Sequence, residues 1–186
     1  VAAITERAMR GEIAFEPALR ERVALLKGLP ESVVDEVIAR RVTLMSGAAR
    51  LLRVMRRHGT YAALVSGGFT VFTGPIAAKL GFDEHRSNRL VVEDGRFAGA
   101  VAEPILGQQA KLDALRDLTA RLKLDPRETM AVGDGANDLA MIGAAGLGVA
   151  YHAKPAVAAA AAARIDWSDL TALLFAQGYR DSDLAA

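Results

Sequence analysis

The sequence contains no cysteine and few aromatic residues. Among its 186 residues, Phe, Trp and Tyr together make up 5%. The absence of cysteine excludes disulfides, thiolate metal sites and a cysteine nucleophile, and it fits a reducing, cytoplasmic location. Because aromatic rings are scarce, we expect a core of Ala, Leu, Val and Ile, for which the 52% content of hydrophobic residues is ample.

An excess of charge of either sign is also missing. Twenty-three Lys and Arg residues face 22 Asp and Glu residues, which gives a formal net charge of +1. This balance gives no electrostatic reason to expect a nucleic acid or an anionic membrane as partner. No run reaches the roughly 18 to 20 apolar residues that span a bilayer. The first ten residues, VAAITERAMR, carry three charges and predict no secretory signal.

Helical periodicity fills the first 58 residues, and strands alternate with helices from about residue 60 onward. This order predicts an α/β fold with a parallel sheet covered by helices, divided into a helical part (residues 1–44) and an α/β part (residues 45–186). The helices are expected over residues 1–10, 15–27, 31–42, 47–58, 70–80, 108–122, 138–145, 155–163 and 170–177. The strands are expected over residues 60–65, 129–132, 147–150 and 165–167, with a hairpin over residues 89–101 that turns at Asp94 and Gly95.

Two acidic residues follow the predicted strand at residues 129–132. In the run MAVGDGANDLAMI, Asp134 lies between two glycines and Asp138 begins the next helix. Two carboxylates that converge across a glycine turn can bind one hard cation such as Mg²⁺, which prefers oxygen ligands. A D-x-x-x-D pattern alone is more often a turn residue followed by a helix cap. The buried strand and the paired glycines favour the metal site here.

A second polar loop follows the predicted strand at residues 60–65. Its residues Ser66, Gly67 and Gly68 would offer a hydroxyl group and backbone N–H donors to an anion. An ordinary strand-to-helix loop explains them equally well. A serine nucleophile is not expected, because residue 64 is Leu and the pattern G-x-S-x-G is not met. In a parallel sheet, ligands bind beyond the carboxyl ends of the strands, where both loops are expected.

Two cationic side chains are candidates for binding an anion. Lys111 lies near the start of a predicted helix, where most lysines are solvated surface residues. Its interest is that a phosphate bound by a serine, amides and a metal still needs a cation. Arg20 and Arg22 cannot face the same direction on one helix, and spacing alone favours a surface role for Arg22. Three histidines lack metal-ligand spacing and are expected to be structural or exposed: His58, His85 and His152.

The segments SGGF, Lys111 and GDGANDLAMI, in this order, resemble the haloacid-dehalogenase-like phosphatases, and within them the phosphoserine phosphatase branch. The likeness extends from residue 1 to about residue 175. LRERVALLKGLP is similar to the helical cap of that branch, and NRLVVEDGRFAG to its hairpin. GDGANDLAMI is specific for the superfamily, and its combination with SGGF and LRERV is specific for the branch. The resemblance implies a three-layer, Rossmann-like parallel sheet with a small helical cap.

The resemblance also implies a Mg²⁺-dependent hydrolysis of O-phosphoserine to serine and phosphate, the last step of serine biosynthesis. In that family an aspartate forms an aspartyl-phosphate, and a second aspartate two residues later acts as general acid and base. Asp134 would ligate the metal with Asp138 as its companion, and Lys111 would neutralise the phosphate and the nucleophile. The other implied contacts are phosphate binding by Ser66, Gly67 and Asn137, carboxylate binding by Arg22, and an apolar cap wall of Met9 and Phe15.

The nucleophile motif of that family, an apolar strand followed by D-x-D-x-[TV], does not occur in this sequence. The D-x-D of Asp181 and Asp183 has no strand before it. Since the sequence opens on Val1 in a helical pattern, we expect the nucleophile, its strand and a substrate-binding glutamate to lie upstream. That strand is central in the family, so the strands near Val65 and Val132 would expose backbone groups and an apolar stripe. These 186 residues alone are predicted to be unstable or inactive.

Two other hypotheses remain open. The first is a non-catalytic phosphate-binding or regulatory module that has lost the nucleophile. The second is a phosphatase of the same superfamily for another small phosphorylated metabolite. Under the second hypothesis Arg22→Ala would matter little, whereas in a phosphoserine enzyme it would weaken substrate binding by about 2 to 4 kcal/mol.

Overall fold

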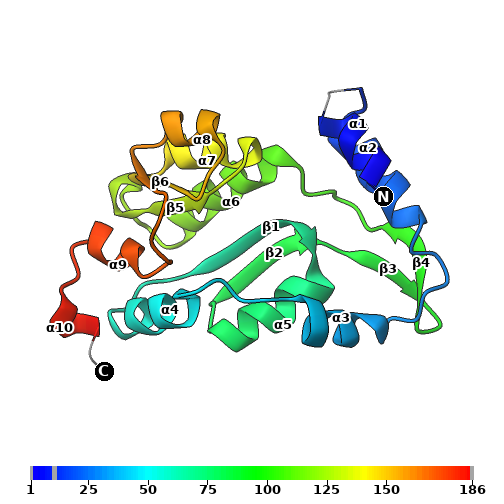
Figure 1. Ribbon diagram of the computed structural model, residues 1–186, viewed down its shortest axis with the longest axis horizontal. Helices are drawn as coiled ribbons and strands as arrows, with labels where there is room; N and C mark the ends of the chain where they lie inside the picture. The colour runs from blue at the N-terminus through cyan, green and yellow to red at the C-terminus, as the bar shows by residue number, and fades with distance from the viewer. Residues whose placement is uncertain (1, 10–11, 185–186) are drawn as a thin grey trace. The chain divides into compact units, whose positions relative to one another are not determined.

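The computed structural model describes residues 2–9 and 12–184 of the chain (Figure 1). The chain divides into two compact units. Unit 1 comprises Val1–Thr43, Ser66–Lys79 and His85–Gly107, and unit 2 comprises Leu44–Val65, Leu80–Glu84 and Gln108–Ala186. The first passage between them falls between Thr43 and Leu44. The assignment of a cap and a core to these units stays a prediction.

Unit 1 combines short helices with a β-hairpin. Helix α2 packs against strand β4, and their apolar side chains form the centre of this unit with those of α3 and β3. The helices are α1 (Ala2–Met9), α2 (Phe15–Ala24), α3 (Val33–Arg41) and α5 (Thr70–Leu80), the last residue of which belongs to unit 2. The hairpin strands are β3 (Leu90–Glu93) and β4 (Arg96–Val101).

The hairpin turn is formed by Asp94 and Gly95, as the sequence predicted. Both residues have positive φ angles, 49° and 71°. Two consecutive left-handed residues give the turn a twist that matches the twist of the strands, which explains why Asp-Gly is so strong a hairpin signal. The antiparallel strands pair Val92 with Phe97, and Phe97 is buried in the core of unit 1.

Unit 2 is built on a parallel sheet, which confirms the predicted α/β class. Its strands β5 (Met130–Gly133), β6 (Leu147–Tyr151) and β7 (Ala163–Ile165) lie side by side in that order, and β5–β6 and β6–β7 are both parallel. Helices α7 and α8 pack against β6. The helices are α4 (Ala48–Arg57), α6 (Gln108–Arg121), α7 (Leu139–Ala144), α8 (Pro155–Ala160), α9 (Ala172–Ala176) and α10 (Asp181–Leu184), with 3-10 turns η1 (Pro126–Glu128) and η2 (Ala136–Asp138).

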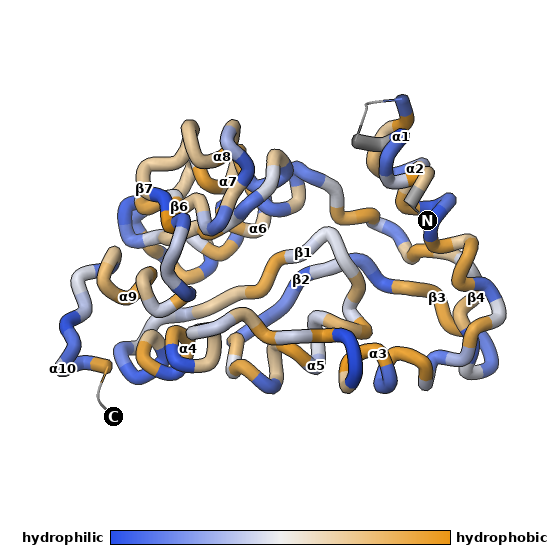
Figure 2. The backbone as a smooth tube through the Cα atoms, viewed as in Figure 1, coloured by the Kyte–Doolittle hydropathy of each residue, from blue (hydrophilic) through white to orange (hydrophobic). Residues whose placement is uncertain are grey.

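Strand β1 (Ala63–Phe69) begins in unit 2 and ends in unit 1. The sequence predicted its end at Val65, and this boundary was wrong. The strand continues because it pairs with β2 (Glu84–Asn88), a polar segment that was not predicted as a strand. Figure 2 shows the hydrophobic start of β1 and the near-neutral hydropathy of Ser66–Gly68. Backbone pairing, rather than apolar side chains, keeps this second half extended.

Other boundaries differ by a few residues. The last strand was predicted at residues 165–167, but it lies at Ala163–Ile165, and Trp167 is 95% exposed. Helix α8 therefore ends at Ala160, because the chain must enter β7 only three residues later. No helix among the described residues combines the length and the hydropathy needed to cross a membrane.

Candidate active site

The acidic loop of unit 2, which we define as Gly133–Asp138, connects β5 with α7. Asp138 is 2% exposed, and both of its carboxylate oxygens have partners. Oδ1 forms an ion pair with Nζ of Lys111, which α6 supplies. Oδ2 accepts hydrogen bonds of 3.1 Å from the backbone amides of Asp134 and Gly135. One buried carboxylate thus fixes the loop to α6 and sets its backbone conformation.

Gly133 makes room for that carboxylate. A Cβ atom placed on Gly133 would overlap the Cβ and Cγ atoms of Asp138 and would lie 2.7 Å from its Oδ2. Any side chain at this position would push the Asp138 carboxylate away from its partners. The sequence predicted a glycine for a tight turn, and the structure shows that it also accommodates a buried acid.

Asp134 differs from Asp138 because its side chain is exposed. Within the described part of the chain, its carboxylate has no hydrogen-bond or ion-pair partner, while its backbone oxygen accepts a 3.1 Å hydrogen bond from the amide of Lys154. Asn137, in the same loop, is exposed as well. The loop therefore holds Asp134 in place through its backbone and leaves the carboxylate available to a cation.

The donor set fits a hard cation only in part. Among residues 2–9 and 12–184 there is no group of three or more His, Cys, Asp or Glu side chains that could hold a metal ion. Asp134 offers free oxygen donors of the kind that Mg²⁺ prefers. Both oxygens of Asp138 are already engaged, so direct ligation would require it to exchange a partner. The role of Asp138 as a metal ligand stays a prediction.

The Ser66 loop of unit 1, which we define as Ser66–Gly68, forms part of the second half of β1. The amide of Gly68 donates a 3.0 Å hydrogen bond to Ser66 Oγ. Phe15, at the start of α2, lies beside this loop: a Cβ atom placed on Gly67 would lie 3.8 Å from Phe15 Cζ. On Gly107 it would lie 3.7 Å from Phe15 Cδ1. Within unit 1, the structure thus places Phe15 beside Gly67, one of the predicted phosphate-binding residues.

The two arginines of α2 face different partners, as the helix geometry required. Arg20 is exposed and forms an ion pair with Glu103, which lowers the pKa of that carboxyl group. Arg22 is half-buried and donates hydrogen bonds to the side chain of Thr5 (3.4 Å) and the carbonyl of Ala18 (3.3 Å). Both of these acceptors are neutral, so neither compensates the charge of Arg22. Met9 ends α1, but its side chain lies outside the described residues.

Sequence reasoning missed one buried polar residue near the Ser66 loop. Asn88, at the end of β2, is 1% exposed and donates a 3.1 Å hydrogen bond to the carbonyl of Gly67. Nothing in the run HRSNRL distinguishes this asparagine from a surface residue. The three histidines contact other side chains and the backbone: His58 packs edge-on against Tyr179, His85 bonds Thr73, and His152 stacks on Tyr151 and bonds the carbonyl of Ser168.

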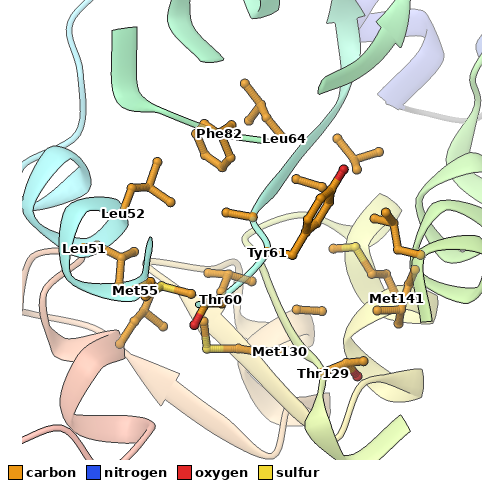
Figure 3. A pocket seen from close by; sticks show the side chains of 18 of the residues that line it. Leu51, Leu52, Met55, Thr60, Tyr61, Leu64, Phe82, Thr129, Met130 and Met141 are labelled. Atoms are coloured by element: carbon orange, nitrogen blue, oxygen red, sulfur yellow. The ribbon is translucent and has the colours of Figure 1, made fainter. Parts of the chain in front are cut away.

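A cavity of about 380 Å³ lies within unit 2. Ala63–Val65 of β1 and Met130–Val132 of β5 both line it, with apolar side chains from several helices. Figure 3 shows Leu51, Leu52 and Met55 of α4 on one side and Met141 of α7 on the other. Among the described strands, β1 pairs with β2 and β5 pairs with β6, so β1 and β5 face this cavity without pairing with each other. Lys111 and Asp138 also line it.

The sequence is similar to known hydrolases over most of its length. The sequence model of the haloacid dehalogenase-like hydrolase family matches residues 2–143. The chain is 47% identical over 179 residues to a phosphoserine phosphatase of Polaromonas sp., which covers 94% of this chain and 76% of the relative. It is 45% identical over 174 residues to a phosphoserine phosphatase of Haemophilus influenzae, covering 94% of this chain and 55% of the relative. The corresponding relative from Mycobacterium tuberculosis is 45% identical over 186 residues, covering 100% of this chain and 45% of the relative.

Solved structures show the same likeness. The crystal structure of a probable phosphoserine phosphatase from Vibrio cholerae superimposes with a TM-score of 0.88 at 40% identity, covering 95% of this chain and 57% of that one. A substrate-bound phosphoserine phosphatase complex gives a TM-score of 0.84 at 39% identity, covering 94% and 83%. The chain spans about half the length of the H. influenzae and M. tuberculosis relatives.

Proposed function

Because the chain belongs to the haloacid dehalogenase-like hydrolase family, we propose that it forms most of a Mg²⁺-dependent phosphatase that hydrolyses O-phosphoserine. The reaction gives serine and phosphate and would be the last step of serine biosynthesis in the cytoplasm. The acidic loop carries this proposal: one buried carboxylate, on Asp138, fixes the loop through Lys111 and two amides, and the exposed carboxylate of Asp134 has no partner among the described residues. The substrates named for similar proteins set the choice of phosphoserine.

The metal and the phosphate would be held mainly by the acidic loop. Asp134 would ligate Mg²⁺, and Asp138 would keep the loop in the conformation that presents Asp134. When bound, Mg²⁺ neutralises negative charge on the phosphoryl oxygens. Lys111 lies next to Asp138 and would contribute a second positive charge, and Asn137 would orient the phosphate or a metal-bound water.

The remaining contacts would come from unit 1. The Ser66 hydroxyl and the Gly67 amide are hydrogen-bond donors suited to the phosphate oxygens. Phe15 places an apolar ring beside this loop, against which the carbon atoms of serine can pack. Arg22 would bind the substrate carboxylate, because its hydrogen-bond partners in the structure carry no charge.

The nucleophile would come from an aspartate outside these 186 residues. Its carboxylate oxygen would attack phosphorus to give an aspartyl-phosphate, and the serine oxygen would leave with a proton from a second aspartate. Water would then attack phosphorus, which releases phosphate and restores the carboxylate. The chain as given is therefore proposed to bind ligands without turnover.

The cavity between β1 and β5 supports this proposal. Since β1 and β5 line the same apolar space and are not paired with each other, their facing edges can accept one strand between them. A strand buried on both faces is typically a continuous apolar run, and the lining of leucines and methionines suits such a run. We propose that the apolar strand before the nucleophile occupies this cavity, with its carboxyl end near Lys111 and Asp138.

A reconstitution experiment tests both the outside nucleophile and the placement of its strand in the cavity. The 186-residue chain is mixed with Mg²⁺, phosphoserine and a synthetic peptide of six apolar residues followed by D-x-D-x-T. We expect phosphate release only with the peptide, and none with a matched peptide in which both aspartates are replaced by asparagine. Amide hydrogen exchange of Met130–Gly133 and Ala63–Val65 should slow with either peptide. Clear turnover by the chain alone would contradict the need for an outside nucleophile.

Substrate analogues separate phosphoserine from other phosphorylated metabolites. Phosphoethanolamine is phosphoserine without its carboxylate, so it cannot use Arg22. We expect Arg22→Ala to weaken phosphoserine binding by about 2 to 4 kcal/mol and to leave phosphoethanolamine binding unchanged. Arg20→Ala, on the same helix but exposed, is the matched control and should change neither. Equal loss for both ligands would show that Arg22 does not bind the carboxylate.

A non-catalytic phosphate-binding module is the second candidate, because the chain contains no nucleophile motif. That hypothesis predicts phosphate binding that no peptide converts into turnover. The reconstitution experiment therefore distinguishes the two: phosphate release with the aspartate peptide selects the enzyme. Binding of phosphate and peptide without release selects the module.

A further inference from the structure

Asn88 is buried in unit 1 and uses its whole side-chain amide. Its Oδ1 accepts a 2.7 Å hydrogen bond from the amide of Leu106, and its Nδ2 donates to the carbonyls of Gly67 (3.1 Å) and Leu106 (3.3 Å). A buried amide is costly unless it is hydrogen-bonded, and here one acceptor and two donors are satisfied. The side chain is thereby fixed between the Ser66 loop and the segment before α6.

The chemistry of these contacts requires an amide side chain. The Oδ1 atom must accept from an N–H group, and the Nδ2 atom must donate to two carbonyl oxygens. A flipped amide would therefore place donor against donor and acceptor against acceptor. Aspartate could accept from Leu106 but could not donate to Gly67. Alanine would leave the Gly67 carbonyl and the Leu106 amide without this partner. Asn88 therefore determines where the Gly67 carbonyl points.

The orientation of the Gly67 carbonyl also fixes the hydrogen bond that the next amide donates to Ser66. The carbonyl of Gly67 and the N–H of Gly68 belong to one planar trans peptide, in which they point in opposite directions. While the carbonyl bonds Asn88, the N–H on the other side donates 3.0 Å to Ser66 Oγ. The Gly67–Gly68 peptide is thus a rigid link between Asn88 and the serine hydroxyl.

This link leaves the hydroxyl proton of Ser66 available. A serine hydroxyl has one donor and two acceptor positions, and the Gly68 amide occupies one acceptor position. The proton must therefore point away from that amide, and an anion can accept it. Gly68 also lies close to the hydroxyl, since a Cβ atom placed on it would lie 3.2 Å from Ser66 Oγ.

We propose that Asn88 is a positioning residue for anion binding at Ser66, acting through the Gly67–Gly68 peptide. It does not touch the anion. The identity of the anion as a phosphate group rests on the proposed function, whereas the link itself rests on the hydrogen bonds described. Loss of Asn88 should allow this peptide to rotate, which would remove the fixed acceptor contact on Ser66 and weaken anion binding.

Phosphate titration of the 186-residue chain tests the proposal, with Mg²⁺ present and the amide NMR signals of Ser66–Gly68 as the readout. We expect Asn88→Ala to raise the Kd for inorganic phosphate about tenfold, which corresponds to 1.4 kcal/mol. Asn88→Asp should match it, because both donors are lost. Ser87→Ala is the control: Ser87 precedes Asn88 on β2, is 8% exposed, and its hydroxyl lies 2.7 Å from Thr73 Oγ1. It should leave the Kd within about twofold.

A double-mutant cycle separates positioning from general destabilisation. If Asn88 acts through Ser66, then Asn88→Ala should cost little further affinity in a Ser66→Ala background. Additive losses would overturn the proposal even if both single variants bind phosphate weakly. An unchanged Kd in Asn88→Ala would overturn it as well.

If phosphate does not bind at all, the proposed function is contradicted. Amide hydrogen exchange in the ligand-free chain still tests the link between Asn88 and Ser66. We expect exchange of the Gly68 amide to be at least about tenfold faster in Asn88→Ala than in Ser87→Ala. Equal exchange rates at Gly68 in the two variants would refute the link between Asn88 and Ser66.

Discussion

The two loops assigned to the chemistry are stabilised in opposite ways. In unit 2 the acidic loop is fixed by charge, because the Asp138 carboxylate pairs with Lys111 and accepts from two backbone amides. In unit 1 the Ser66 loop is fixed by neutral groups, namely the Asn88 side-chain amide, a peptide plane and a hydroxyl. Within residues 2–9 and 12–184, each arrangement leaves one functional group without a partner: a carboxylate on Asp134 and a hydroxyl proton on Ser66.

The difference matches the ligands that each loop would bind. A cation site needs a free carboxylate, and Lys111 takes up the charge of the second acid so that the two acids do not repel each other. An anion binds more tightly where no negative charge lies next to the hydrogen-bond donors. A loop that depends on a buried ion pair should also lose more stability when one partner is removed than a loop that depends on neutral hydrogen bonds.

The largest expected effect is that of Asp138→Ala. Lys111 is 14% exposed, so the substitution leaves a mostly buried, unpaired charge and two amides without their acceptor. We expect the free energy of unfolding to fall by about 3 to 5 kcal/mol in urea denaturation. The control Asp134→Ala removes an exposed acid and should change it by no more than about 0.5 kcal/mol. If the two variants were equally stable, the buried ion pair would not be what stabilises the acidic loop.

Gly133→Ala should have the next largest effect. The new Cβ atom would overlap the Asp138 side chain, and we expect a loss of about 1 to 3 kcal/mol in the same assay. Gly143→Ala in α7 is the control, because nothing lies within 4 Å of its Cβ position; it should be stabilising by about 0.4 to 1 kcal/mol. Combining Gly133→Ala with Asp138→Ala should cost less than the sum of the two, since the clash disappears with the carboxylate.

Phe15→Ala tests the apolar side of the Ser66 loop. Since the ring lies beside Gly67 and Gly107, its loss should weaken phosphoserine binding about fivefold, or about 1 kcal/mol. Inorganic phosphate has no carbon atoms to pack against the ring, so its Kd should not change. Calorimetric titration measures both, and Leu25→Ala, at an exposed leucine of unit 1, is the control. A parallel loss for both ligands would place the ring on the phosphate group instead.

The smallest effect concerns an acid of unit 2 that is held by neutral donors. The Thr171 hydroxyl and amide and the Ser46 hydroxyl lower the pKa of Asp169 from its ordinary value of 3.8. A lowered pKa in the folded state means that the stabilisation is present above the ordinary value and is lost as the pH falls through the lowered one. Asp169→Asn should therefore flatten the pH dependence of the free energy of unfolding below about pH 4. We expect this change to be smaller than each of the effects above. A steeper dependence in the variant would contradict the sign.

The sequence predicted local features well because their causes are local. Asp94 and Gly95 form the hairpin turn through their own backbone preferences, and the glycines around Asp134 indicated a loop after a buried strand. The pairing of Lys111 with Asp138 joins positions 27 residues apart, and it depends on how α6 packs against the acidic loop. Each residue was a candidate by itself, but no periodicity indicated that they would form a pair.

The missed features share a physical reason. The polar run Glu84–Asn88 forms β2 because it pairs with β1. Strand pairing cannot be recognised in the sequence of a segment that lacks alternating apolar residues. The same pairing extends β1 through Ser66–Gly68, where a loop was predicted. Asn88 was overlooked for a related reason, since an asparagine in a polar run gives no sign of burial.

The interleaved course of the chain has a consequence for protein engineering. Both units are assembled from three separate stretches of sequence, and β1 belongs to both. No single cleavage by a protease can therefore release either unit, and no simple truncation yields one of them intact. Exchanging one unit for that of a homologue would mean grafting three stretches at once, so recombination at a single crossover point cannot exchange one unit by itself.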